Sequence, residues 1–262
     1  MAKFLVQKSA PLHGEVKISG SKNAVLPIMA AALLTEEKCE IKDVPALRDV
    51  QVMCKLLESL GATVDPELDE NNVDITAGSV LTYEAPYELV KMMRASILVL
   101  GALLLGTGRA VIPLPGGCAI GKRPVELHLK GLKALGATID EERLARGIVD
   151  AKADKLKGTT IYLDFPSVGA TEVIIMAASL AEGTTVLENA AQEPEIVDLA
   201  NFITSMGGRV RGAGTKVIKI EGVPELTGSE HQVIPDRIEA GSYLIAAAMT
   251  GGELTLENVI AD

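Results

Sequence analysis

GLKALGATID, residues 131–140, is one of three similar segments in this chain. LLESLGATVD, which ends at Asp65, and FITSMGGRVR, residues 202–211, have the same arrangement, with central glycines Gly61, Gly136 and Gly207 placed 75 and 71 residues apart. Each segment has the last turn of an amphipathic helix, a glycine suited to the left-handed conformation at a helix end, and the start of a strand. This period indicates an architecture of repeated supersecondary units.

A second pattern alternates with the first. Four segments each contain an apolar, Ala-rich helix, a turn and a strand: VLPIMAAALLTEEKCEIKDV, SILVLGALLLGTGRAVIPL, EVIIMAASLAEGTTVLENA and YLIAAAMTGGELTLENV. One unit therefore contains a strand, a helix, a strand, a second helix and one or two further strands. The Ala-rich helices are apolar nearly all round and are predicted to be buried on all sides, whereas the helices before the glycines are amphipathic and should face solvent.

The fourth unit is incomplete. It begins near Gly228, and the sequence ends at Asp262, after one helix and one strand. The apolar part of that helix, residues 243–249, would lack covering elements. We therefore expect three complete units plus part of a fourth, and a chain that is either a fragment or is completed by a second chain.

Composition excludes several classes of protein. The net charge of −10 argues against a nucleic-acid-binding protein, because no surplus of basic residues is present to neutralise phosphates. Three cysteines, odd in number and far apart, predict neither a disulfide framework nor a metal knuckle, and they favour the cytoplasm. The longest apolar run, residues 95–106, is shorter than the roughly 20 residues that span a bilayer, so no membrane segment is expected.

The segment SGSKNA, residues 19–24, could bind an anion. Ser21, Lys22 and Asn23 lie where a buried helix is predicted to begin, and helix N-termini offer free N–H groups and a positive dipole end. A lysine adds a full positive charge for a phosphate or a carboxylate. The alternative is an ordinary helix cap followed by a surface lysine.

The loop PGGCAIGKRP, residues 115–124, could carry a reactive thiol. Cys118 is followed by Lys122 and Arg123, whose positive charges would lower a thiol pKa. Glycines at both ends would let the loop move as a lid. Cys39, in a predicted strand, and Cys54, in a predicted helix, fit the role of small buried apolar residues better.

The same loop resembles a nucleotide-binding P-loop from Gly116 to Lys122. Arg123 stands where that motif needs a Ser or Thr to bind magnesium, and Pro124 follows it. We therefore disfavour a nucleoside triphosphatase.

Two further helix starts are candidates. Arg94 lies at the head of an apolar helix, where its charge either reaches water or lines a cleft. Ser167, Val168 and Gly169 precede another apolar helix, whose N–H groups could contact an anion, although simple capping explains the pattern equally well. The three histidines, His13, His128 and His231, have no ligand-like spacing, so no metal or catalytic role is assigned to them.

Four segments taken in order resemble the UDP-N-acetylglucosamine enolpyruvyl transferases: SGSKNA at 19–24, PGGCAIGKRPVELH at 115–128, SVGATE at 167–172 and PDRIEAG at 235–241. The resemblance implies an α/β fold, an inside-out α/β barrel of repeated βαβαββ units, with three units in each of two domains. It also implies one complete domain at residues 22–229, whereas residues 1–21 and 230–262 belong to a partial second domain.

The resemblance further implies a reaction. Members transfer the carboxyvinyl group of phosphoenolpyruvate to the 3′-hydroxyl of UDP-N-acetylglucosamine, release phosphate, and need no metal or other cofactor. Cys118 would donate the proton, could form a covalent phosphoenolpyruvate adduct, and would be alkylated by fosfomycin. Phosphoenolpyruvate would contact Lys22, Asn23 and Arg123. The UDP-sugar would contact the following residues: Arg94, Arg123, Pro124, Val125, Glu126, Leu127, Ser167, Val168 and Gly169.

Three hypotheses remain open. The first is the enolpyruvyl transferase, the second is a non-catalytic module of the same fold that binds a UDP-sugar or a protein, and the third is the P-loop ATPase. The carboxylate that would contact the sugar hydroxyl and a further phosphate-binding arginine would lie beyond Asp262, in a C-terminal half supplied in cis or in trans. We therefore expect little turnover by this chain alone.

Overall fold

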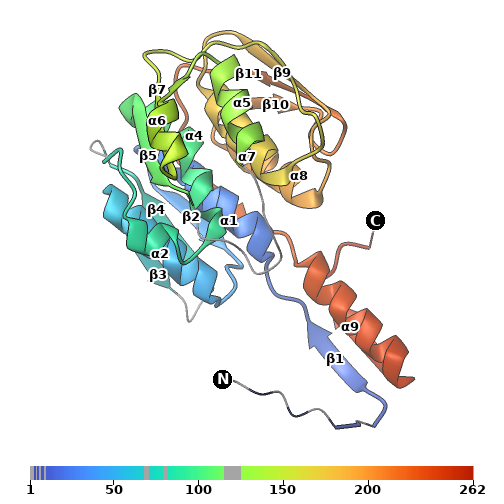
Figure 1. The fold of residues 1–262 in the computed structure, drawn as a ribbon. Coiled ribbons are helices and arrows are strands. Elements are labelled where there is room, and N and C mark those ends of the chain that lie inside the picture. Colours follow the sequence, from blue (N-terminus) through green and yellow to red (C-terminus); the bar gives the residue numbers. More distant parts are fainter. Residues whose placement is uncertain are drawn as a thin grey trace.

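The computed structural model describes residues 10–67, 71–78, 82–114 and 125–261, together with Lys3, Leu5, Gln7 and Lys8. A main body contains most of these residues, and a smaller part with β1, α9 and β13 extends from it (Figure 1). Two segments that lie side by side join the two parts. Gly20 forms a β-bridge with Pro235, and Ser21 donates its backbone N–H to the carbonyl of Ile234 at 2.8 Å.

From α1 onward, the first unit of the main body follows the predicted order of elements, but its first strand comes from a later part of the chain. Its sheet has the strand order β12-β2-β4-β3, in which β12 (Glu230–Gln232) pairs in parallel with β2. A segment late in the chain thus completes the sheet of the first unit, and its residues 230–232 directly follow the predicted domain boundary at residue 229. The division into domains itself stays a prediction. The other elements are α1 (Lys22–Ala31), η1 (Ala32–Leu34), β2 (Cys39–Lys42), α2 (Arg48–Leu60), β3 (Thr63–Glu67) and β4 (Asn72–Thr76).

The second unit has a three-stranded sheet with the order β5-β7-β6. Glu84 makes an isolated parallel bridge to Val111 in β5, at the position of the first strand of the other units. The elements are α3 (Tyr87–Val90), η2 (Arg94–Leu98), α4 (Val99–Thr107), β5 (Arg109–Pro113), α5 (Glu126–Ala134), β6 (Thr138–Ile139), α6 (Glu141–Ala145) and β7 (Ile148–Lys152).

The third unit has the complete βαβαββ order. Its sheet runs β10-β11-β9-β8, with β8 parallel to β9 as β12 is to β2. The first and third units therefore share one topology, although the first obtains its initial strand from residues 230–232. The elements are β8 (Thr160–Tyr162), α7 (Val168–Ser179), β9 (Thr184–Glu188), α8 (Pro194–Ser205), β10 (Arg209–Arg211) and β11 (Val217–Glu221).

The Ala-rich helices form the centre of the main body. Residues 24–31 of α1, 99–104 of α4 and 170–179 of α7 are all buried, and α4 packs against both α1 and α7. By contrast, α2 buries one face and exposes residues such as Lys55 and Glu58. The prediction of buried and amphipathic helices is thus confirmed for these elements.

The three repeated glycines end helices as predicted. Gly61, Gly136 and Gly207 have φ angles of 108°, 106° and 95°, in the left-handed region that glycine adopts without steric cost. The strands β3, β6 and β10 begin two residues after these glycines. The periodic glycines therefore mark the chain reversals that define the units.

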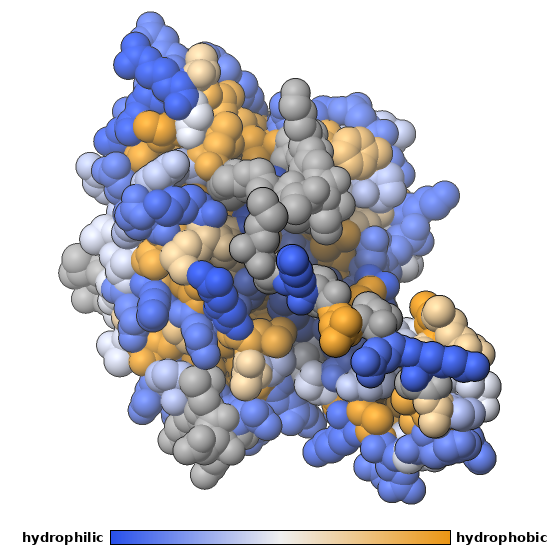
Figure 2. Space-filling model, turned by 60° about the horizontal axis from the view of Figure 1, so that its bottom comes forward, coloured by the Kyte–Doolittle hydropathy of each residue, from blue (hydrophilic) through white to orange (hydrophobic). Residues whose placement is uncertain are grey.

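The smaller part is open to solvent. In it β1 (His13–Lys17) pairs in parallel with β13 (Glu253–Glu257), and α9 (Arg237–Thr250) has no buried residue. Leu244, Ile245 and Met249 are 58%, 62% and 81% exposed. Figure 2 shows hydrophobic side chains on the surface of this part, at its lower right. The expectation of an uncovered apolar helix at residues 243–249 is confirmed.

Candidate functional site

Four segments singled out from the sequence begin helices in the structure. Lys22 opens α1, Arg94 opens η2, Glu126 opens α5 and Val168 opens α7. The first N–H groups of a helix have no partner within it, and the dipole end is positive. The helix starts at Lys22, Arg94 and Val168 are thus confirmed where the sequence placed them. Their role in binding substrates stays a prediction.

The N-terminus of α1 lacks the usual cap. Ser21 occupies the N-cap position, where a serine hydroxyl commonly accepts a hydrogen bond from a backbone N–H of the first turn, yet its side chain makes no such bond. Its Oγ atom is buried and has no partner among the described residues. Unpaired buried polar atoms are rare and costly. The first turn of α1 therefore keeps polar groups that an anionic ligand could engage.

Lys22 is only loosely paired. Its Nζ atom lies 3.6 Å from Oδ2 of Asp49, and the two side chains are 41% and 38% exposed, so the pair contributes little stability. Its backbone N–H donates to Oδ2 of Asp236 at 3.4 Å, and Oδ1 of Asp236 caps α9 by accepting from the N–H of Ile238 at 2.7 Å. A phosphate or carboxylate could thus replace Asp49 beside the ammonium group at small cost.

The helices α5 and α7 meet at their first turns. The N-cap of α5 is Val125, which has no side-chain acceptor, whereas Ser167 caps α7 weakly through Oγ, 3.4 Å from the N–H of Ala170. A Cβ atom built on Gly169 would lie 2.9 Å from Nε2 of His128, so the imidazole lies directly against the start of α7. Two helix N-termini are therefore in contact around one histidine.

His128 also lies near Arg94. Burial, and then the positive charge of Arg94, lower the pKa of His128 from 6.5 to about 4, so the ring is neutral at physiological pH. Sequence reasoning gave His128 no role, because a single histidine on a helix carries no spacing signal. The structure brings Arg94, the start of α5 and the start of α7 together around it, and α1 packs against η2.

Two buried acidic residues lie near each other, Glu172 in α7 and Glu195 in α8. Glu195, in the first turn of α8, accepts from Nε and Nη2 of Arg237 at 3.0 and 3.3 Å. Burial, followed by the charges of Glu195 and Glu193, raises the pKa of Glu172 from 4.5 to about 8, so this carboxyl group is largely protonated at neutral pH. The sequence segments SVGATE and PDRIEAG indicated this region, but they did not indicate that Arg237 pairs with Glu195.

The two cysteines among the described residues are buried and lack the lowered thiol pKa of a reactive cysteine. Cys39 in β2 and Cys54 in α2 are buried free thiols, as predicted. Burial raises the pKa of both, that of Cys54 to about 11. Cys118, Arg123 and Pro124, with the P-loop-like segment from Gly116 to Lys122, lie outside the described residues. Their predicted roles remain predictions.

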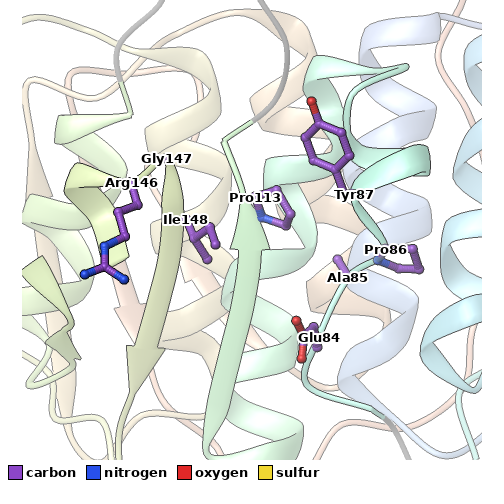
Figure 3. A pocket seen from close by; sticks show the side chains of 8 residues that line it. All are labelled: Glu84, Ala85, Pro86, Tyr87, Pro113, Arg146, Gly147 and Ile148. Carbon is purple, nitrogen blue, oxygen red and sulfur yellow. The ribbon is translucent and has the colours of Figure 1, made fainter. Parts of the chain in front are cut away.

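A groove of about 580 Å³ lies at the end of the second sheet where β5 ends and β7 begins. Pro113 and Ile148 extend into it from β5 and β7, and Glu84, Pro86 and Tyr87 come from the segment beside β5 (Figure 3). None of the candidate site residues that the structure describes lines it. Among the described residues, the groove and the helix starts therefore share no lining residue.

Neither a metal centre nor a membrane span emerges from the described residues. Within them, no group of three or more His, Cys, Asp or Glu side chains is arranged to hold a metal ion. None of their helices combines the length and the apolar character needed to cross a bilayer.

Comparison with protein families and curated sequences identifies close relatives. The EPSP synthase (3-phosphoshikimate 1-carboxyvinyltransferase) profile matches residues 6–262. UDP-N-acetylglucosamine 1-carboxyvinyltransferase 1 of Caldanaerobacter subterraneus subsp. tengcongensis is 58% identical over 99% of this chain and 61% of its own length. UDP-N-acetylglucosamine 1-carboxyvinyltransferase 2 of Carboxydothermus hydrogenoformans is 57% identical over the whole chain and 61% of its own length. The chain thus spans about three fifths of these relatives.

Solved structures share the fold at lower identity. The enolpyruvyl transferase NikO from Streptomyces tendae has a TM-score of 0.79 and 24% identity, covering 90% of this chain and 55% of that one. An EPSP synthase from Acinetobacter baumannii has a TM-score of 0.73 and 22% identity, covering 97% of this chain and 57% of that one. The predicted α/β fold of repeated units, of the enolpyruvyl transferase type, is confirmed by these matches.

Proposed function

The chain belongs to the EPSP synthase (3-phosphoshikimate 1-carboxyvinyltransferase) family. Within this family, we propose that it serves in the transfer of the carboxyvinyl group of phosphoenolpyruvate to the 3′-hydroxyl of UDP-N-acetylglucosamine, a step of peptidoglycan synthesis. The observation that carries this proposal is the 58% identity, over 99% of the chain, to a UDP-N-acetylglucosamine 1-carboxyvinyltransferase. Identity to the solved EPSP synthase is only 22%, so the nucleotide-sugar reaction is favoured over the shikimate reaction.

In this proposal the helix starts hold the two anionic substrates. Phosphoenolpyruvate lies beside Lys22 and Asn23, with Arg123 as a second cation. The start of α1, which the Ser21 side chain does not cap, and the loosely paired ammonium of Lys22 support this placement. The positive dipole end and a full cationic charge both favour a phosphate or carboxylate there.

The UDP-sugar is assigned to the neighbouring helix starts. Arg94, the segment from Arg123 to Leu127, and the segment from Ser167 to Gly169 contact it. The contact of Gly169 with His128 and the nearness of Arg94 support one shared site, because they bring these elements together. Two helix N-termini and an arginine suit a diphosphate.

Cys118 is proposed as the proton donor. Its proton adds to C3 of phosphoenolpyruvate, which leaves a cationic centre at C2. The sugar 3′-hydroxyl attacks C2 and loses its own proton, and the tetrahedral intermediate then loses phosphate and a C3 proton. In a covalent side path the Cys118 sulfur itself adds to C2. Cationic side chains stabilise the developing charge, so the proposal includes no metal or cofactor.

The setting proposed is the cytoplasm, where both substrates are soluble and thiols are reduced. We also propose that this chain alone turns over slowly. The relatives are longer, and a carboxylate for the sugar hydroxyl and a further arginine are assigned to the portion that they have beyond the matched region, supplied in cis or in trans.

Phosphate release tests the proposal. The chain is incubated with phosphoenolpyruvate and UDP-N-acetylglucosamine, alone and with a polypeptide corresponding to the remaining part of a relative, and Cys118→Ser is the control. Release that requires both substrates and disappears in Cys118→Ser supports the assignment, as does covalent labelling by fosfomycin of the wild-type chain but not of Cys118→Ser. Binding of UDP-N-acetylglucosamine without release under either condition supports a non-catalytic binding module instead.

Lys22→Ala tests whether phosphoenolpyruvate and the UDP-sugar bind at different helix starts. It should weaken phosphoenolpyruvate binding by about tenfold to a hundredfold, the value of one or two charge-assisted hydrogen bonds, and leave UDP-sugar binding within about twofold. Equal losses for both substrates would contradict the placement of phosphoenolpyruvate at α1.

A further inference from the structure

His128 occupies an unusual position for a core residue. Its side chain is 3% exposed, and its Nδ1 atom makes no well-aligned hydrogen bond among the described residues, although a backbone hydrogen bond at Val125 opposes the lowering of its pKa. An unpaired buried polar atom costs about 1–3 kcal/mol, and an apolar side chain of similar size would avoid that cost. The packing around the ring, rather than this cost alone, indicates what the imidazole does.

The ring lies between elements that the proposed function assigns to one ligand. Its own helix, α5, begins with the segment at Val125–Leu127. Its Nε2 edge lies against Gly169, where an added Cβ atom would approach to 2.9 Å, closer than real contacts allow. Arg94 lies near enough for its charge to disfavour protonation of the ring. Any change in the volume of this ring thus alters the spacing of the two helix N-termini.

We propose that His128 is a positioning residue of the nucleotide-sugar site: its imidazole ring sets the separation between the first turns of α5 and α7, so that the N–H groups of both helices can contact one UDP-sugar. Gly169 is the matching partner, because only a residue without a side chain fits against the ring. This inference rests on the proposed function. It adds a residue that the sequence had left without a role.

The test is a double-mutant cycle, read as the dissociation constant of UDP-N-acetylglucosamine by calorimetry on the 262-residue chain. Gly169→Ala should weaken binding about tenfold or more, because the new methyl group pushes the ring and α7 apart. His128→Ala should also weaken binding. In the double variant the methyl group has room, so adding Gly169→Ala to His128→Ala should cost less than about twofold.

A matched control lies on the same helix pair. A Cβ atom on Gly131 of α5 would come within 2.3 Å of Ile174 on α7, away from the first turns. Gly131→Ala should lower the melting temperature but change UDP-sugar affinity less than about twofold. The melting temperature of each variant is measured as well, and affinities are compared at a temperature where all are folded.

The outcomes separate the two proposals. Strong coupling between positions 128 and 169, with an unaffected Gly131→Ala, supports the positioning role. If the wild-type chain binds UDP-N-acetylglucosamine but the effects of His128→Ala and Gly169→Ala are small or simply additive, the positioning role is wrong and the proposed function stands. If the wild-type chain does not bind this ligand, the assignment of the UDP-sugar to these helices fails, and the role of His128 fails with it.

Discussion

Arg237 and Glu195 form a two-point ion pair between α9 and α8. Nε and Nη2 of the guanidinium donate to the two carboxylate oxygens at 3.0 and 3.3 Å, and the Glu195 side chain is 2% exposed. The pair joins the first turn of the projecting helix to the main body. It also neutralises a buried carboxylate that lies near Glu172.

Removing this arginine should therefore destabilise the main body itself. Arg237→Ala leaves the Glu195 carboxylate buried without its partner, and we expect a loss of about 1–3 kcal/mol in the free energy of unfolding, less than for a fully buried pair because Arg237 is 48% exposed. Denaturant unfolding measures it. Arg209→Ala, which removes a more exposed arginine 4.0 Å from Glu221, should cost less than about 0.5 kcal/mol. Equal effects of the two substitutions would refute the importance of the buried pair.

Glu172 should make the free energy of unfolding fall as the pH rises from 4.5 toward 8. Its pKa is raised from 4.5 to about 8 by burial and by Glu195 and Glu193, so the unfolded chain loses this proton at lower pH than the folded one. The stability that the protonated Glu172 carboxyl group provides is complete below pH 4.5 and is lost as the pH rises toward 8.

Glu172→Gln keeps the shape of the neutral acid without its titration. The variant should gain stability relative to wild type between pH 5 and 8, by up to about 1.4 kcal/mol for each pH unit. Unfolding curves across this range measure the difference, and the exposed Glu142→Gln serves as the control. A difference that does not change with pH would show that Glu172 is ionised in the folded chain.

His128 should make the free energy of unfolding fall as the pH drops from 6.5 toward 4, the opposite dependence to that of Glu172. Burial and Arg94 lower its pKa from 6.5 to about 4, so the unfolded chain takes up this proton first as the pH falls. The stability that the neutral ring provides is present above pH 6.5 and is lost toward pH 4. Relative to His128→Gln, wild type should lose about 1–3 kcal/mol over this interval. A parallel pH profile for the two proteins would mean that the ring is protonated in the fold.

The sequence was sufficient to predict the units, because glycine conformation and apolar periodicity are local properties. Gly61, Gly136 and Gly207 marked the ends of three helices, and the apolar runs of α1, α4 and α7 marked the core. The pairing of β12 with β2 was not predictable, since it joins residues about 190 apart by hydrogen bonds that carry no local signal.

The site was predictable only in part, for the same reason. Lys22, Arg94 and Ser167 lie at helix starts that turn chemistry reveals. The contact of His128 with Gly169 and the ion pair of Arg237 with Glu195 depend on how separate helices pack, and neither residue of either pair has a spacing pattern that would indicate the other. Buried polar groups that act through tertiary contacts are therefore what sequence reasoning missed.

Gly20 should be the least replaceable glycine before α1. A Cβ atom there would lie 1.7 Å from the carbonyl oxygen of Asp43, a backbone atom that cannot move aside, and Asp43 itself has a φ angle of 57°. Gly20→Ala must therefore displace either the start of α1 or the turn after β2. We expect a loss of about 3 kcal/mol or more, together with weaker phosphoenolpyruvate binding, because Ser21 and Lys22 follow directly.

Gly241 provides the matched control. It lies within α9, no atom of the described residues stands within 4 Å of a Cβ atom built on it, and alanine favours helix more than glycine does. Gly241→Ala should therefore raise the free energy of unfolding of the part it belongs to by up to about 1 kcal/mol. Thermal unfolding of both variants distinguishes them by sign. A neutral Gly20→Ala would mean that the segments 17–21 and 43–45 can separate without loss of the fold, which would contradict the close approach on which the position of Lys22 depends.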